Sequence, residues 1–384
     1  RHPAVEFLAV DLLDVGRILL GLVLLVGGGE LLVRGASAIA TRVGISPLVV
    51  GLTVVAAATS APELAVSIGA TLDGQPDLAV GNVVGSNIIN ILLILGVSAL
   101  VLPLVVREQL VRLDVPVMVG MTVLLLVLAL DLRISFGEGL LLLGLMLAHT
   151  VATVLVSRRG QAKEAAHNDD AGESGPGPEK ARPVPGVLPS LLFVAAGVGL
   201  LVFGADQLVT GAVSIAGALG VSGLVVGLTV VAVGTSLPEL ATSVIAAVRG
   251  ERDMAVGNIV GSNIVNIGLV LGVPALISSG GLPVPPAAVA LDIPLMLAAA
   301  VALSPVVLTG FCIARWEGGM FLALYAAYTG FVVLDAINHD ALEGFTFVMV
   351  LFVLPLVAVT LVATVGYELG VRAGRQQERE RAGS

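Results

Sequence analysis

The feature that most limits the fold of this chain is a succession of eleven apolar runs, most of them about 20 residues long. A helix of that length spans the roughly 30 Å hydrocarbon core of a bilayer. Only 12% of the residues are charged, against about 25% in soluble domains, and the mean hydropathy is +1.05. Aromatic residues make up only 4%, too few for the aromatic girdles of an outer-membrane barrel. The sequence therefore predicts an all-α polytopic membrane protein. The expected segments are roughly residues 15–40, 45–71, 78–103, 113–131, 137–156, 187–218, 222–248, 254–279, 287–310, 316–335 and 344–370.

Two polar stretches within these runs occur twice, both at an offset of 176 residues. Residues 51–64 read GLTVVAAATSAPEL and residues 227–240 read GLTVVAVGTSLPEL, with eleven of fourteen positions identical. Residues 79–96 (AVGNVVGSNIINILLILG) and 255–272 (AVGNIVGSNIVNIGLVLG) share fourteen of eighteen. The chain is therefore expected to contain two homologous halves.

Each half holds five spans. Because five is an odd number, the second half starts on the opposite side of the membrane and should be inverted relative to the first, as in many secondary transporters. This predicts a first repeat over 1–156, a flexible linker over 157–186, an inverted second repeat over 187–335, and an extra helix with a basic tail over 336–384. The linker is polar and rich in Gly and Pro, which is typical of disorder. The eleventh span is expected to be a peripheral packing helix, with an oligomer contact as the alternative.

The distribution of Lys and Arg predicts the orientation. With the N-terminus outside, sixteen of these residues fall in inner loops, and only Arg1, Arg17 and Arg133 lie outside. Positive residues are enriched in cytoplasmic loops, so we expect a multi-pass protein of the cell (inner) membrane with a cytoplasmic C-terminus. The net charge of −9 gives no argument for a nucleic-acid partner. The bilayer is the expected environment, and a monomer is compatible with the sequence.

The TSxPE motif places a carboxylate where a membrane helix is normally apolar. Pro62 and Pro238 should break their helices, and the freed carbonyls are tolerated at membrane depth only in protein or a cavity. Glu63 and Glu239 are costly in the bilayer unless paired. Since no intramembrane Lys or Arg matches them, a bound cation is the expected partner. A protonated, structural glutamate is the alternative.

The second motif, GNxxGSNxxN, puts polar side chains on one helix face at i, i+4 and i+8. They are Asn82, Ser86 and Asn90 in the first half and Asn258, Ser262 and Asn266 in the second. They are either ion ligands or interhelical hydrogen-bonding groups. Asn87 and Asn263 point elsewhere, and we expect them to be structural.

The donors suit hard cations. Two glutamates provide four oxygens, and Thr59 and Thr235 add two, a number that suits Ca²⁺. No His or Cys cluster is present, which disfavours zinc, copper and iron. Neutral oxygens nearby suit monovalent ions.

The duplicated motifs resemble the alpha-repeats of the sodium/calcium exchanger family in the cation/calcium antiporter superfamily, and the resemblance covers spans one to ten. It implies Na⁺-driven Ca²⁺ transport through four clustered cation sites, with Ca²⁺ and Na⁺ as transported ions and no resident cofactor. It also implies that the first and sixth helices slide across the core. By this resemblance Ca²⁺ would contact Thr59, Glu63, Thr235 and Glu239. Na⁺ would use Ser60, Glu63, Ser86, Asn90, Ser236, Glu239, Ser262, Asn266 and the carbonyls of Ala56 and Ala232.

Three rival functions fit the sequence less well. A proton-coupled relative would carry glutamate where Gly85 and Gly261 stand, and some members, including K⁺-coupled ones, carry aspartate in place of Asn266. A channel fits discontinuous helices in inverted halves less well than alternating access does. An intramembrane enzyme is disfavoured because no Ser–Lys dyad, aspartate pair or HExxH motif is present.

Three other features are expected to have structural roles. An i,i+4 ion pair is expected between Glu30 and Arg34. Glu30 and its counterpart Asp206 are expected to support structure or gating. His149 is expected to be a packing residue.

Overall fold

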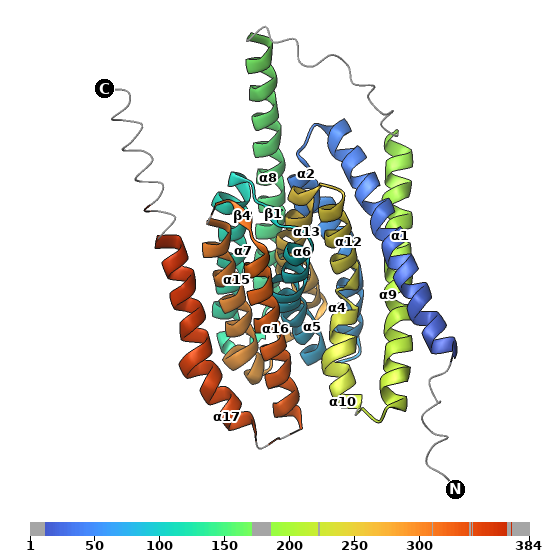
Figure 1. Ribbon diagram of the computed structural model, residues 1–384, viewed down its shortest axis with the longest axis vertical. Coiled ribbons are helices and arrows are strands. Elements are labelled where there is room, and N and C mark those ends of the chain that lie inside the picture. The colour runs from blue at the N-terminus through green and yellow to red at the C-terminus, as the bar shows by residue number, and fades with distance from the viewer. Residues whose placement is uncertain are drawn as a thin grey trace.

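The computed structural model describes residues 12–170, 186–221, 223–308, 310–337, 339, 341–366 and 370. Nearly all of these residues are helical (Figure 1). In the first half the elements are α1 (Leu12–Val43), α2 (Pro47–Val50), η2 (Gly51–Val55), α3 (Ala56–Thr59), α4 (Ala61–Leu72), α5 (Pro76–Ile89), η3 (Asn90–Ile94), α6 (Leu95–Val101), β1 (Leu104–Val105), η4 (Leu110–Asp114), α7 (Val115–Leu128), η5 (Ala129–Asp131), β2 (Arg133–Ile134) and α8 (Phe136–Asp170).

The second half repeats this order as far as α16, without a counterpart of η5 among the described residues, and α17 and η9 follow. Its elements are α9 (Val187–Ala218), α10 (Gly223–Val226), η6 (Gly227–Val231), α11 (Ala232–Gly234), α12 (Leu237–Val248), α13 (Arg252–Val265), η7 (Asn266–Val270), α14 (Gly272–Ile277), β3 (Leu282–Pro283), η8 (Ala288–Asp292), α15 (Ile293–Leu308), β4 (Cys312–Ile313), α16 (Arg315–Ala336), α17 (Ala341–Val348) and η9 (Met349–Val353). The η elements are single π-helical turns, except η5, which is a 3-10 turn.

Within the described part of the chain, nine helices are long and apolar enough to cross a membrane. The bent pair Pro47–Thr59 and Ala61–Leu72 counts as a tenth span, in which the helix direction changes by 43° at the break. The remaining expected segment, 222–248, is divided among α10, η6, α11 and α12, and α12 alone is a short apolar helix. The all-α polytopic fold class is therefore confirmed, and the eleven expected segments differ in how continuous they are.

The two helices that carry the GNxxGSNxxN motifs form the centre of the molecule. The most apolar windows of spans Pro76–Val101 and Arg252–Ile277 are 78% and 83% buried, whereas the corresponding windows of the other long spans are at most 39% buried. Most of the amide and hydroxyl side chains of the motif are buried, so they are enclosed by protein and do not face lipid. They are Ser86, Asn87, Asn90, Asn258, Ser262, Asn263 and Asn266.

Helices α1 and α9 form a separate pair along one edge (Figure 1). Glycines spaced seven residues apart let their backbones touch: a Cβ added to Gly21, Gly28 or Gly35 would lie 2.7–2.8 Å from a backbone carbonyl of α9. The carbonyls belong to Gly204, Gly197 and Ser190 respectively, so the two helices run antiparallel. Such close approach is typical of small residues at membrane helix interfaces.

Two short antiparallel ladders join the halves, a feature that the apolar pattern did not predict. Strand β1 pairs with β4, and β2 pairs with β3. In each ladder the strand following the third span of one half pairs with the strand preceding the fifth span of the other. The ladders therefore connect the halves at equivalent places.

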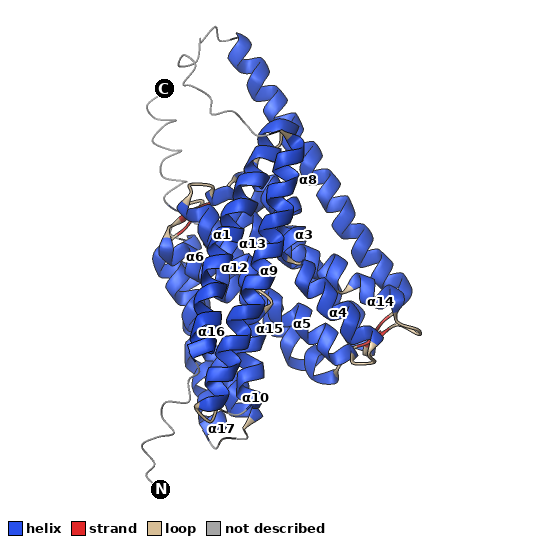
Figure 2. Ribbon diagram, turned by 90° about the vertical axis from the view of Figure 1, so that its right-hand side faces the viewer, coloured by secondary structure: helices blue, strands red, loops and turns tan. Residues whose placement is uncertain are grey.

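The linker expected over 157–186 differs from the structure in its first part. Helix α8 continues to Asp170 and projects beyond the other helices (Figure 2). Residues 171–185, like most of the basic tail, lie outside the described residues.

Candidate ion-binding site

Each TSxPE motif interrupts its helix at the serine. At Ser60 and Ser236 the backbone leaves helical geometry, with φ, ψ of −82°, 6° and −91°, 6°. A new helix then begins with Pro62 or Pro238 in its first turn, where the missing N–H of proline costs nothing. The glutamate that follows lies in this first turn, where the helix dipole favours negative charge.

The backbone beside each motif is also irregular. Both TSxPE motifs follow a π-helical turn of identical sequence, GLTVV, in η2 and η6. Both GNxxGSNxxN motifs run into another such turn, which begins at Asn90 in η3 and at Asn266 in η7. Such turns are frequent at functional sites because they shift side chains and backbone groups out of the regular helical pattern. All four motifs therefore adjoin distorted backbone.

The two glutamates are held crosswise between the halves. The Ser60 hydroxyl donates to Glu239 Oε1 at 3.3 Å, and the Ser236 hydroxyl donates to Glu63 Oε1 at 3.5 Å. Glu63 is 0% exposed and Glu239 1%. The second oxygen of each carboxylate, Oε2, has no hydrogen-bond partner among the described residues. The arrangement thus offers two buried, uncommitted carboxylate oxygens to a cation.

Further uncommitted oxygens come from the central helices. Asn90, Ser262 and Asn266 are fully buried, and Asn90 Oδ1, Ser262 Oγ and Asn266 Oδ1 have no partner in the described structure. Ser86 is also buried. Unsatisfied buried oxygens are rare in native proteins and call for an explanation. Hard cations bind oxygens of this kind. In the described residues no group of three or more His, Cys, Asp or Glu side chains is found, so a cation here would be bound by two carboxylates together with neutral oxygens.

The two halves of the site are not equivalent. Thr59 is 1% exposed, and its hydroxyl lies 3.1 Å from the Val55 carbonyl and 3.2 Å from Asn258 Oδ1. Its counterpart Thr235 is only half-buried and lines a cavity of about 190 Å³ together with Asp206. The site is therefore closed beside the first-half threonine and adjoins a hollow beside the second.

The two expected carbonyl ligands differ in the same way. Ala56 is fully buried, and its carbonyl accepts from the Ser60 N–H at 3.0 Å and from the Thr59 hydroxyl at 3.4 Å. Ala232 is exposed. The Thr59 hydroxyl has a single proton, and the Val55 carbonyl at 3.1 Å is a nearer acceptor of it. The Ser60 N–H is therefore the main donor to the Ala56 carbonyl, and a Na⁺ ion would compete with the Thr59 contact for the second lone pair.

The sequence did not predict that the first asparagine of each GNxxGSNxxN motif donates hydrogen bonds to the helix before it. Asn82 donates to the Glu63 carbonyl at 3.1 Å and to Ser67 Oγ at 3.0 Å. Asn258 donates to Ser243 Oγ at 3.0 Å. In both halves the asparagine and the serine are 15 residues apart, and this repeated spacing could have indicated the contact.

The expected pair of Glu30 and Arg34 is confirmed, with a separation of 2.5 Å. Arg249, at the end of α12, also pairs with Glu30 and links α1 to the core. Asp206 instead accepts from its neighbour Gln207 at 3.0 Å. The two counterparts therefore have different partners.

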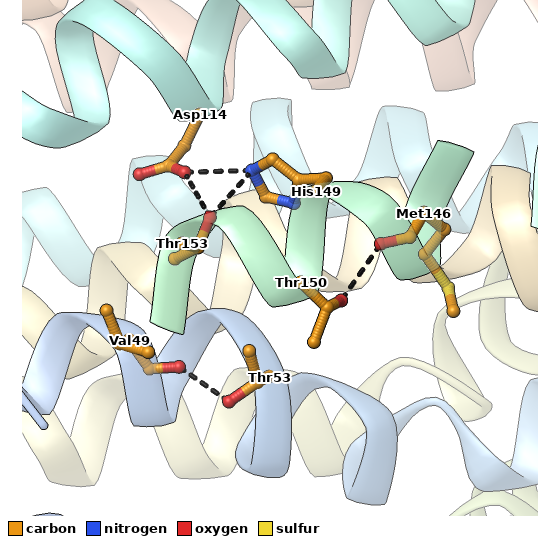
Figure 3. A network of polar contacts seen from close by, with 7 residues as sticks. All are labelled: Val49, Thr53, Asp114, Met146, His149, Thr150 and Thr153. Carbon is orange, nitrogen blue, oxygen red and sulfur yellow. Dashed lines mark hydrogen bonds and ion pairs between the residues drawn. The ribbon is translucent and has the colours of Figure 1, made fainter. Parts of the chain in front are cut away.

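The expectation that His149 is a packing residue is wrong. Its Nε2 lies 2.9 Å from Asp114 Oδ1 and 3.3 Å from the Thr153 hydroxyl, in a buried network between η4 and α8 (Figure 3). A single histidine in an apolar run gave no sign of this network, because its partner is 35 residues away. Its members are not among the expected ion ligands.

Comparison with known proteins agrees with the motifs. The family model described as sodium/calcium exchanger protein matches residues 13–155 and 189–334. The putative antiporter CaxA of Alkalimonas amylolytica is 40% identical over 286 residues, which are 74% of this chain and 87% of that protein. The sodium/calcium exchanger MaX1 of Methanosarcina acetivorans is 34% identical over 337 residues, 81% and 96% of the two chains.

Solved structures give the same result. The sodium-calcium exchanger NCX_Mj, soaked with 2.5 mM Na⁺ and 0.1 mM Ca²⁺, is 34% identical and superposes with a TM-score of 0.68. The match covers 82% of this chain and 97% of that one. The chain therefore belongs to the sodium/calcium exchanger protein family, whose members are transporters and not enzymes.

Proposed function

We propose that this chain is a secondary antiporter that exchanges Na⁺ for Ca²⁺ by alternating access. The observation that carries the proposal is the pair of buried glutamates, each hydrogen-bonded to a serine of the other half and each with one uncommitted oxygen. Two uncompensated carboxylates at membrane depth are costly without a cationic partner. A transported cation supplies that partner and is released when the site opens.

The ligand assignment follows the chemistry of the donors. Ca²⁺ is assigned to Glu63, Glu239, Thr59 and Thr235, which combine two charges with neutral oxygens. Na⁺ is assigned to the two glutamates with the neutral donors Ser60, Ser236, Ser86, Ser262, Asn90, Asn266 and the carbonyls of Ala56 and Ala232. The burial of the serines and asparagines supports this assignment, and the bonds already made by the Ala56 carbonyl make it the weakest member.

The two halves are proposed to be inverted five-helix repeats, with boundaries at 1–156 and 187–335. The antiparallel course of α1 and α9 supports this arrangement. The N-terminus is placed outside and the C-terminus in the cytoplasm of the cell membrane, because this puts most Lys and Arg inside.

The cavity beside Thr235 and Asp206 supports alternating access. One threonine of the site is enclosed, while its counterpart adjoins a hollow, and such unequal access to the two halves is what alternating access needs.

Coupling to H⁺ or K⁺ is the alternative. Glycine at 85 and 261 leaves no extra carboxylate for protons, and the amide of Asn266 offers one neutral oxygen and no charge for a further monovalent ion. The test is Ca²⁺ flux in proteoliposomes with each gradient imposed separately. Flux driven by Na⁺ and unaffected when K⁺ is replaced by an inert cation is expected. Strict dependence on K⁺, or flux driven by a pH gradient alone, would overturn the proposal.

A further inference from the structure

A short chain of amides connects the two central helices beside the proposed site. The Asn266 amide nitrogen donates to Asn87 Oδ1 at 3.0 Å. The Asn87 amide nitrogen donates to the backbone carbonyl of Asn263 at 3.4 Å. All three residues are at most 1% exposed. Asn87 therefore lies between a fixed backbone acceptor and a proposed ligand of Na⁺.

The backbone carbonyl sets the direction of this chain. A carbonyl oxygen only accepts hydrogen bonds, so the amide group of Asn87 that faces Asn263 must be its NH₂. The oxygen of Asn87 then faces Asn266, which must present its own NH₂ in return. A reversed Asn87 would place its oxygen against the Asn263 carbonyl and its NH₂ against the NH₂ of Asn266, so both hydrogen bonds would be lost.

The oxygen of Asn266 is consequently directed away from Asn87. Asn266 Oδ1 is buried without a partner in the described residues, and it belongs to η7, which packs against α4, the helix that bears Glu63. An amide in the opposite orientation would present hydrogen atoms to a cation and repel it. The orientation that Asn87 enforces is the one that a cation ligand needs.

The other half of the molecule lacks this anchor. Asn263, the counterpart of Asn87, donates instead to the Ile259 carbonyl of its own helix at 3.1 Å. Asn90, the counterpart of Asn266, has no partner for either amide atom among the described residues. Identical residues at identical motif positions therefore differ in their contacts, which provides a matched control.

We propose that Asn87 is a positioning residue that holds the oxygen of Asn266 toward transported Na⁺. This inference rests on the proposed function, because it takes Asn266 as a Na⁺ ligand. It goes beyond the ligand assignment by making Na⁺ affinity depend on a residue that binds no ion. Ca²⁺, assigned to the glutamates and threonines, does not depend on Asn87.

The test uses the purified full-length protein, with Na⁺ displacing bound radioactive Ca²⁺ at equilibrium. Asn87→Leu is expected to lower the affinity for Na⁺ about fivefold, which is the effect of losing one hydrogen bond that fixes a ligand. The Ca²⁺ affinity should change less than twofold. Asn263→Leu, the same substitution at the equivalent position, should leave Na⁺ affinity unchanged. If the leucine variant does not fold, Asn87→Ala removes the same amide with less steric demand.

A second comparison separates positioning from general damage. Asn266→Asp replaces the amide with a carboxylate, which has an acceptor on either side and needs no orientation. In that background, Asn87→Leu should no longer weaken Na⁺ binding, as a double-mutant cycle detects. An equal loss in both backgrounds, or an equal loss in Asn263→Leu, would overturn the inference. A wild-type protein whose bound Ca²⁺ is not displaced by Na⁺ would instead overturn the proposed function, and the inference with it.

Discussion

Glu63 and Glu239 are each held by a serine from the other half of the chain. Each carboxylate is thereby fixed through one oxygen, and the other oxygen has no partner in the described structure. A charged, preorganised acceptor of this kind binds a divalent cation strongly because its ligands need little rearrangement on binding. The site therefore depends on charge and on contact between the halves together.

Glu63→Gln and Glu239→Gln should each reduce Ca²⁺ transport by at least about 100-fold, because one lost charge-assisted ligand costs several kcal/mol in a buried site. Glutamine has nearly the same size, so the fold should be kept. Ca²⁺ flux and size-exclusion elution would be measured for each variant. Glu108→Gln removes a carboxylate from an exposed ion pair with Arg112 and should transport normally. A folded double variant with wild-type flux would rule out the site.

Transport should fall as the medium becomes acidic. Both glutamates must be ionised to hold Ca²⁺, and a proton on either one removes a charge that the ion needs. Lower pH therefore favours the proton, and higher pH favours Ca²⁺ until both carboxylates are ionised and the rate becomes constant. The measurement is the Ca²⁺ concentration for half-maximal flux between neutral and mildly acid pH. A concentration that does not rise on acidification would contradict competition.

The sequence was sufficient to nominate the site residues, because TSxPE and GNxxGSNxxN occur twice and polar residues are otherwise scarce in these spans. It could not reveal that Ser60 contacts Glu239 or that Asn87 contacts Asn266, since these contacts join residues 179 positions apart. It also could not reveal the unequal burial of Thr59 and Thr235. Symmetric motifs predict symmetric surroundings, and the packing of the helices breaks that symmetry.

At the scale of elements, irregular helices position the proposed ligands. The restart of α4 and α12 at a proline puts each glutamate in a first helical turn. A π-helical turn precedes each TSxPE motif, and another begins at the last asparagine of each GNxxGSNxxN motif. The breaks at proline were predictable from the sequence. The π-helical turns were not, because no residue type specifies them.

At two adjacent glycines of α1, substitution by alanine is predicted to change the stability of the protein in different directions. Gly28→Ala should destabilise the protein by about 1–3 kcal/mol, the usual cost of overpacking, because its Cβ would lie 2.8 Å from the Gly197 carbonyl. Gly27→Ala meets no atom within 4 Å and should be neutral or stabilising by up to about 1 kcal/mol through helix propensity. Thermal unfolding in detergent would compare them. Equal effects of the two substitutions would contradict the close contact.

The remaining differences between expectation and structure also concern elements. The apolar pattern predicted the spans but not the two-residue strands β1 to β4, which are too short to give a periodic signal. It placed the end of the fifth span at residue 156, whereas α8 continues to Asp170. The polar sequence after 156 can extend a helix once a long membrane span has nucleated it.

At the scale of the whole molecule, the two halves contribute one buried glutamate each to the single proposed site. Their charges balance one Ca²⁺, and about three Na⁺ in the same place would leave one net positive charge. Moving one charge through 100 mV is worth about 2.3 kcal/mol. Exchange should therefore respond to voltage, and a negative interior should drive net positive charge inward. Flux measured at clamped potentials that does not change with voltage would contradict this stoichiometry.

The most direct test of the account is Ca²⁺ uptake by proteoliposomes loaded with Na⁺ and diluted into Na⁺-free medium. We predict saturable uptake that stops when the Na⁺ gradient is collapsed by an ionophore, and that is absent when both Glu63 and Glu239 are replaced by glutamine. Uptake that persists without a Na⁺ gradient, or that survives the double substitution in a folded protein, would contradict Na⁺/Ca²⁺ exchange through the paired glutamates.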